Sequence, residues 1–150
     1  MKKFVLVPLL FTGLFFLSGS LGAQIRKIPP EVTEALKSKY PEAGAVTWKD
    51  RFSAFYASFE LKGEKYEARF SSRGEWQSTE NEITRENLPA EVKDGLDKSK
   101  YADWKLRSVY NIELPGNRIQ YRIQVSKSDL QKKNLLFNHE GRLLKDNITL

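Results

Sequence analysis

The residues that could do chemistry in this chain are few. His139 is its single histidine, and cysteine is absent, which excludes thiol catalysis, a disulfide framework and a zinc site built from these two residue types. His139 lies in the segment 138–141, which we expect to form a tight turn between two strands. Such a turn gives too little burial to tune a catalytic base, so we predict that His139 is a solvent-exposed turn residue.

Carboxylates leave two further possibilities. Glu60 and Glu67 are expected as cross-strand neighbours on an outward face, where paired acids could hydrolyse a glycosidic bond. An open, wet face lacks the desolvation that raises the pKa of an acid, so we interpret both as part of a surface charge pattern with Lys62 and Arg69. Calcium is the other possibility, but the sequence has no Asp-rich loop of the EF-hand kind. The sequence therefore predicts a protein that is not an enzyme, with no cofactor and no metal ligands.

The elements that must position these residues occur twice. Residues 28–36 match residues 88–96 at an offset of 60, and residues 70–74 match residues 137–141 at an offset of 67. The extra residues of the second copy can enter at two polar places, the turn at 115–117 and the run 126–133. Two matches in the same order favour duplication over chance. We predict a signal peptide at 1–23 followed by repeats at 24–84 and 85–150.

Each repeat is expected to begin with a helix. Pro29 and Pro89 suit the first helical turn, whose N–H groups have no partners within the helix. Val32, Leu36 and Tyr40 recur every four residues and therefore form one apolar stripe. A stripe of this kind predicts a helix that packs one side against a sheet.

The rest of each repeat alternates with a period of two, as half-buried strands do. The side chains predicted to face inward are Phe55, Ala57, Phe59, Leu61, Ile119, Tyr121, Ile123 and Val125. Shorter strands are expected at 46–49, 75–78, 106–114 and 142–145, with positive φ at Gly74 and Gly141. The pattern predicts an α+β fold with about eight antiparallel strands in one or two sheets and helices on one face.

The N-terminal segment predicts export. Lys2 and Lys3 precede the apolar residues 4–17, and small residues follow at 18–23, as in a signal peptide cleaved after Ala23, or as a second choice after Ser20 or Gly22. The alternative is an uncleaved anchor, but the apolar run is shorter than the roughly 20 residues that span a bilayer. We expect a periplasmic or secreted protein. Without its two leading lysines the chain has 23 basic and 19 acidic residues, and their scatter predicts no nucleic-acid partner.

The chain combines a predicted signal peptide, two helices that begin Pro-Pro-Glu-Val or Pro-x-Glu-Val, and strands that end in a Phe-x-x-x-Gly turn. In these features it resembles the PepSY-like family of exported bacterial proteins. These are related in fold to beta-lactamase inhibitory protein. The resemblance covers roughly residues 25–150 and implies a tandem-repeat sheet whose open face docks a protein, without catalytic residues. Family members commonly have an aspartate after the phenylalanine of the turn. Ser71 and Asn138 stand there in this chain, which argues against a metal role borrowed from relatives.

The function predicted first is a protein-binding or inhibitor-like module with an envelope protein as its partner. The candidate binding residues are outward strand residues: Tyr56, Glu60, Glu67, Arg69, Asn111, Gln120 and Arg122. Tyr56 is expected to be exposed, whereas Trp48 and Trp104 are expected in the core or between helix and sheet. The alternative is an envelope sensor of a small ligand or cation, with a pocket between the repeats lined by Trp76 or Tyr110. The oligomeric state stays open.

Overall fold

The computed structural model describes residues 27–148, so the predicted signal peptide lies outside the described residues. The first half contains α1 (Pro30–Lys39), β1 (Gly44–Arg51), β2 (Ala54–Leu61), β3 (Glu64–Ser71) and β4 (Trp76–Ile83). The second half contains the 3₁₀ turn η1 (Arg85–Asn87), α2 (Ala90–Asp97), β5 (Lys105–Leu114), β6 (Arg118–Ser126), β7 (Lys132–Asn138) and β8 (Leu143–Ile148). Neither α-helix of this described part is long and apolar enough to cross a membrane.

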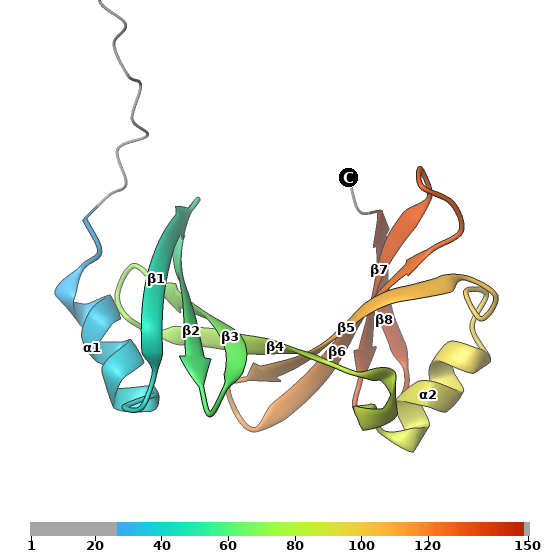
Figure 1. Ribbon diagram of the computed structural model, residues 1–150, viewed down its shortest axis with the longest axis horizontal. Helices are drawn as coiled ribbons and strands as arrows, with labels where there is room; N and C mark the ends of the chain where they lie inside the picture. Colours follow the sequence, from blue (N-terminus) through green and yellow to red (C-terminus); the bar gives the residue numbers. More distant parts are fainter. Residues whose placement is uncertain (1–26, 149–150) are drawn as a thin grey trace, which may run out of the picture.

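All eight strands form one antiparallel sheet in the order β1 to β8. The predicted α+β class is therefore right, and the strands form one sheet rather than two. Figure 1 shows that the sheet curves into a U, with α1 and α2 on its outer side at the two ends. The inner side of the U carries no helix among the described residues and forms a broad concave surface, which we call the open face.

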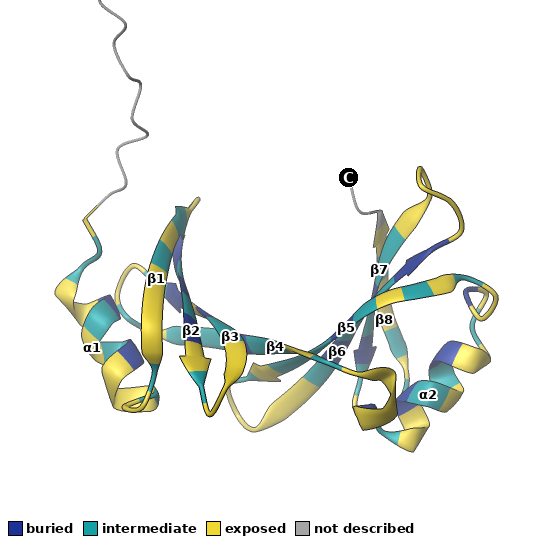
Figure 2. Cartoon of the chain, viewed as in Figure 1, coloured by how far each residue is buried: buried dark blue, intermediate teal, exposed yellow. Residues whose placement is uncertain are grey.

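Each helix packs against its own half of the sheet through the predicted apolar stripe. Val32 and Leu36 of α1 are buried in a cluster with residues of β2 and β3, including Phe55, Phe59 and Phe70. The equivalent stripe of α2 is buried against β5, β6 and β7. Figure 2 shows these buried positions on the sides of the helices that are turned to the sheet. Because the helices cover only the two ends, the molecule has two hydrophobic cores joined by the strands between them.

The predicted turn glycines have positive φ, with values of 80° at Gly74 and 78° at Gly141. Both turns also lie against the first turn of a helix. A Cβ on Gly74 would lie 2.6 Å from the carbonyl oxygen of Glu31, and one on Gly141 would lie 2.0 Å from that of Glu91. A side chain at either position would therefore push the helix away from the sheet, which explains the glycine of each Phe-x-x-x-Gly motif.

Other sequence-based expectations need correction. The strands expected at 46–49 and 75–78 extend to β1 (Gly44–Arg51) and β4 (Trp76–Ile83). Polar side chains ended both predicted strands too early. β4 lies at the middle of the sheet, where no helix covers it and apolar side chains are not needed, whereas β1 is an edge strand that ends in the polar residues Lys49, Asp50 and Arg51. Ile119, predicted to be inward, lies on the helix side but is 38% exposed. Trp48 and Trp104 pack against the two cores as predicted.

Candidate binding site

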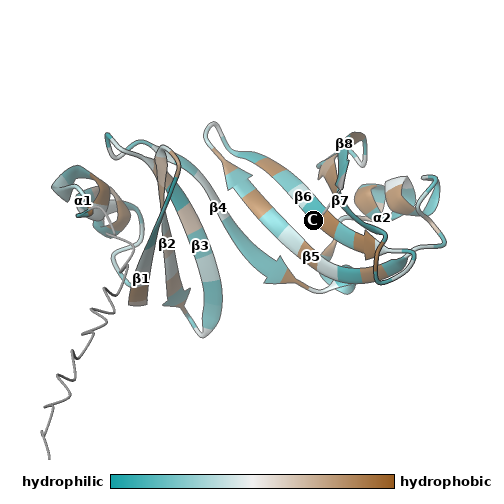
Figure 3. Cartoon of the chain, turned by 90° about the horizontal axis from the view of Figure 1, so that it is seen from above, coloured by the Kyte–Doolittle hydropathy of each residue, from teal (hydrophilic) through white to brown (hydrophobic). Residues whose placement is uncertain are grey.

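The strand register sets out rows of side chains across the open face. In one row, Tyr56 of β2 is opposite Arg69 of β3, which is opposite Ser78 of β4. In the next row, Ser58 is opposite Glu67, and Glu67 is opposite Glu80. Figure 3 shows the same alternation as hydrophilic and hydrophobic bands along β5 and β6. The rows place polar groups of both halves on one surface.

A polar pocket of about 420 Å³ lies on this face where the two halves meet. Its lining consists of Arg51, Tyr56, Glu67, Arg69, Ser78, Glu80 and Arg122. These residues come from β1, β2, β3 and β4 of the first half and from β6 of the second. The pocket therefore exists only because one sheet runs through both halves.

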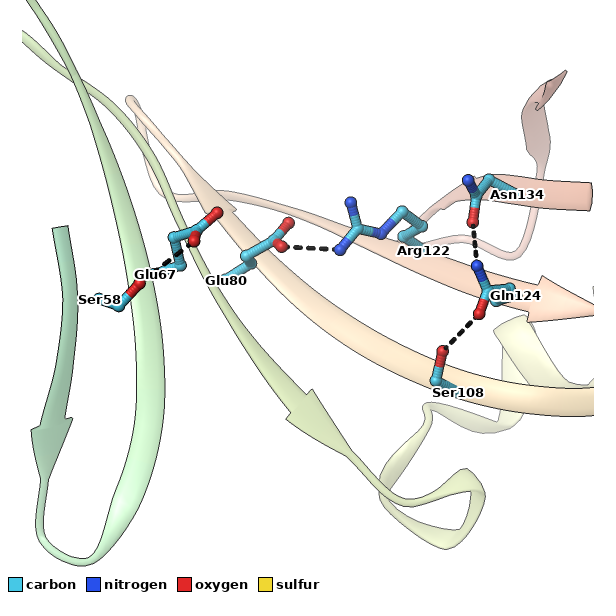
Figure 4. A network of polar contacts seen from close by, with 7 residues as sticks. All are labelled: Ser58, Glu67, Glu80, Ser108, Arg122, Gln124 and Asn134. Atoms are coloured by element: carbon cyan, nitrogen blue, oxygen red, sulfur yellow. Dashed lines mark hydrogen bonds and ion pairs between the residues drawn. The ribbon is translucent and has the colours of Figure 1, made fainter. Parts of the chain in front are cut away.

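Two carboxylates face each other in the pocket. Glu67 and Glu80 are directly opposite in register, an arrangement that destabilises a sheet unless the charges are compensated. The Ser58 hydroxyl donates a hydrogen bond to Glu67 Oε2 over 3.2 Å. Arg122 Nη2 donates one to Glu80 Oε1 over 2.7 Å, and this ion pair is only one-quarter to one-third exposed. Both acids are thus already held by neighbours, as Figure 4 shows.

Figure 4 also shows a separate set of polar contacts in the second half. Gln124 of β6 accepts a hydrogen bond from the Ser108 hydroxyl of β5 over 3.4 Å and donates one to Asn134 of β7 over 3.5 Å. Arg122 also covers the ring of Tyr110, with 4.4 Å from its guanidinium carbon to the ring centroid. The polar floor of the open face therefore extends from β2 to β7.

Arginine and tyrosine side chains form the opposite corner of the pocket. The guanidinium carbons of Arg51 and Arg69 lie 5.5 Å and 5.7 Å from the centroid of the Tyr56 ring, within the range of a cation–π contact. Tyr56 is half-buried rather than fully exposed. Across the described part of the chain, no carboxylate lies within 4.0 Å of either guanidinium, so this corner carries uncompensated positive charge.

The structure brings together four of the seven predicted binding residues: Tyr56, Glu67, Arg69 and Arg122. Glu60 lies opposite Lys65, outside the pocket, so Glu60 and Glu67 are not direct cross-strand neighbours. Gln120 lies on the open face but lines a separate hollow with His139, which is exposed as predicted. Glu60 and Gln120 therefore lie on the open face but outside the pocket.

The predicted placement of Asn111 is wrong. Asn111 is opposite Asn81 and Tyr121, and it is two residues from the buried Val109, so it lies on the helix side of the sheet. Its side-chain amide donates a hydrogen bond to Asn81 over 3.5 Å. Because residues two apart on a strand share a face, the burial of Val109 fixes the side on which Asn111 lies.

Sequence reasoning missed three pocket residues, Arg51, Ser78 and Glu80. Arg51 and Glu80 lie in the parts of β1 and β4 that extend past the predicted strand ends. The alternation of Ser78, Glu80 and Glu82 was the available signal for an outward face.

Trp76 and Tyr110, which were expected to line a sensor pocket, are not among the residues that line this pocket. Trp76 lines a hollow on the helix side, beneath Lys39, and Tyr110 lies under Arg122.

The described residues offer little for a metal ion. Between residues 27 and 148, no group of three or more histidine, aspartate or glutamate side chains gathers at one place. The paired carboxylates Glu67 and Glu80 point into a pocket that also holds three arginines. The arrangement can bind charged and polar groups by ion pairs and hydrogen bonds, and its balance of side chains favours an anionic group.

Fold and site together define a class: a single-sheet α+β protein whose helix-free face carries a polar pocket. Residues 54–145 match the family model described as "Putative beta-lactamase-inhibitor-like, PepSY-like". The chain belongs to this PepSY-like family, as its motifs predicted. No curated protein matches the sequence.

Solved structures agree with this assignment. A "putative periplasmic" protein from Bacteroides eggerthii is 26% identical and superposes with a TM-score of 0.75, covering 81% of this chain and 89% of its own. A DUF2874 family protein from Bacteroides ovatus has the same identity and TM-score, with coverage of 81% and 88%. A BLIP-like protein from Bacteroides fragilis is 27% identical, with a TM-score of 0.72 and coverage of 83% and 89%. The chain is periplasmic or secreted, in line with its predicted export.

Proposed function

We propose that this protein is a non-catalytic, inhibitor-like binding module that receives a segment of an envelope protein on its open face. The observation that carries the proposal is the pocket at the junction of the halves, where Tyr56 and three arginines lie on a broad concave surface. Tyrosine and arginine are enriched among the residues that contribute most to protein interfaces. The family description points to inhibitor-like proteins, and one of the similar solved structures is a BLIP-like protein.

The proposal includes an origin by duplication of one unit. Support comes from the equal order of elements in the two halves, each with one helix followed by four strands. Each helix also rests on a turn glycine of its own half, Gly74 under Glu31 and Gly141 under Glu91. Two similar halves side by side give a longer concave surface than one unit would offer.

A second candidate function is binding of a small ligand as an envelope sensor. The observation in its favour is that the pocket takes residues from both halves, so a bound ligand could alter how the halves are held together. The Arg122–Glu80 contact is the ion pair that a ligand in this pocket would meet. A cation is the less suitable ligand, because arginines outnumber carboxylates in the lining.

Site-specific photocrosslinking in the envelope of the native host tests the first proposal. A photoreactive phenylalanine analogue at Tyr56 should crosslink one defined protein, identified by mass spectrometry. The same analogue at Glu34, an exposed residue of α1 on the outer side of the sheet, is the matched control. A defined product at position 56 that is absent at position 34 supports the proposal. Equal products at both positions, or no protein product at position 56, contradict it.

A further inference from the structure

We propose that the Arg51–Tyr56–Arg69 corner is an anchor for a carboxylate side chain, and that the partner segment bound on the open face is acidic. This inference rests on the proposed function and specifies the chemistry of the partner. The three side chains lie next to one another on the side of the pocket that is formed by β1, β2 and β3.

In the pocket the carboxylates have partners, whereas two of the three arginines have no ion pair within the described chain. Glu80 is paired with Arg122, and Glu67 accepts a hydrogen bond from Ser58. Arg51 and Arg69 have no ion-pair partner among residues 27–148. Lys49, which is opposite Tyr56 in register, adds a third cation beside Arg51 and Arg69 and has no ion pair in that range. The fixed acids of the pocket therefore leave this corner with a surplus of positive charge.

The geometry of the corner suits a carboxylate. A guanidinium presents its N–H groups in a rigid fork that matches the two oxygens of a carboxylate. Each guanidinium lies within cation–π range of the Tyr56 ring, an attraction that favours these positions before binding. The Tyr56 hydroxyl makes no hydrogen bond within the described chain, so it is a further donor beside the two forks. A preorganised set of donors loses less side-chain entropy on binding than free surface arginines would.

A protein segment suits this site better than a free anion. The pocket is open to solvent rather than an enclosed cavity, so a bound group can remain part of a longer chain. Polar contacts continue on the same face from β2 to β7. The polar side chains along that surface, Gln124 and Asn134 among them, offer donors and acceptors to the rest of a segment. The acidic side chain in the pocket would fix the position of the segment along the open face, and hydrogen bonds to these polar side chains would add specificity.

Fluorescence anisotropy with a fluorescein-labelled, capped hexaglutamate peptide tests the inference. The wild-type protein should bind hexaglutamate but not capped hexaglutamine. The double variant Arg51→Ala/Arg69→Ala should bind it at least about tenfold more weakly, a loss of about 1.4 kcal/mol. Tyr56→Phe should weaken binding by a smaller factor, because it removes one donor and keeps the ring under the guanidinium groups.

The matched control is Arg73→Ala/Arg142→Ala. It removes the same charge at two exposed turn arginines, whose turns lie against the helices on the other side of the sheet. This control should leave the affinity for hexaglutamate within about twofold of wild type. The loss of two distant positive charges has only a small effect, because physiological salt screens long-range attraction. Equal weakening by both double variants would show unspecific attraction and overturn the inference. Citrate that competes as strongly per molecule as hexaglutamate would also overturn it, in favour of a free small anion.

The two proposals fail separately. If the crosslink at position 56 identifies a partner while hexaglutamate does not bind, the partner is not held by acidic side chains and only the present inference is wrong. If position 56 gives no crosslinked protein, the proposed function itself is wrong, whether or not hexaglutamate binds. Thermal melting of each variant shows whether it is folded, so a loss of binding is scored only for folded protein.

Discussion

Arg122 and Glu80 are 42 residues apart in the sequence, yet Arg122 Nη2 lies 2.7 Å from Glu80 Oε1 on the open face. The contact joins β6 of the second half to β4 of the first. It also compensates one of the two carboxylates that face each other across β3 and β4. This pair therefore connects the halves and neutralises charge in the pocket at the same time.

A double-mutant cycle on Arg122→Ala and Glu80→Ala should give a coupling energy of roughly 1 kcal/mol, because the pair is partly buried and short. Arg122→Ala should destabilise more than Glu80→Ala, since it leaves Glu67 and Glu80 facing each other without compensation. Urea unfolding measures each term. The control cycle on Arg73 and Glu75, 3.7 Å apart and largely exposed, should give about 0.2 kcal/mol or less. Equal couplings would contradict the assigned role.

Replacement of Phe59 should show which face of the sheet is dry. Phe59 is 3% exposed and packs between Tyr40 and Tyr66, with ring centroids 4.9 Å and 5.7 Å away. Phe59→Ala should lower the free energy of unfolding by about 3 to 5 kcal/mol through lost burial and a cavity. Tyr56→Ala, three residues earlier on the open face, should cost about 1 kcal/mol or less. The reverse order in denaturant unfolding would invert the assignment of the two faces.

Alanine substitutions at two turn glycines should separate backbone strain from close packing. Gly63 and Gly141 have nearly the same φ, 81° and 78°, but a Cβ at Gly63 meets nothing within 4 Å. Gly63→Ala should cost only the left-handed backbone term of about 1 to 2 kcal/mol. Gly141→Ala should cost about 1 to 3 kcal/mol more, because its Cβ would overlap the Glu91 carbonyl. Equal losses in thermal or urea unfolding would mean that α2 moves aside freely.

Asp146 should make stability depend on pH. The Tyr101 hydroxyl donates a hydrogen bond to Asp146, and Lys100 Nζ lies 3.1 Å away. The hydrogen bond, and then Lys100, hold the pKa of the Asp146 carboxyl below its ordinary value. A lowered pKa in the folded state means that the contribution is present above the unfolded pKa of about 3.9 and is lost as pH falls through the folded value.

Thermal melts of wild type and Asp146→Asn from neutral to acid pH provide the measurement. The variant should melt lower than wild type at neutral pH, and the difference should shrink as pH falls below about 4. Asp103→Asn, at an exposed residue near the start of β5, is the control and should track wild type at every pH. A difference that persists undiminished at low pH would show that the carboxylate charge is not what Tyr101 and Lys100 stabilise.

Part of the site followed from alternation alone. Tyr56, Glu67, Arg69 and Arg122 were placed on one face from the period of two, and the structure gathers them in one pocket. Arg51 and Glu80 were missed because polar residues ended the predicted strands early: β1 continues past Trp48 through three polar residues, and β4 continues through a polar stretch to Ile83. Asn111 was expected on the outward face, but its position two residues from the buried Val109 places it on the helix side.

The sequence by itself determined the elements: the helix stripes at Val32 and Leu36, the alternating strands and the glycines that need positive φ. These are local properties, set by side-chain periodicity and backbone sterics within a few residues. Only the tertiary structure decided that β4 pairs with β5, which makes one sheet of two halves and brings Arg122 to Glu80. Strand pairing joins distant segments through backbone hydrogen bonds, and every residue except proline has the same backbone donor and acceptor, so local patterns carry little information about which strands pair.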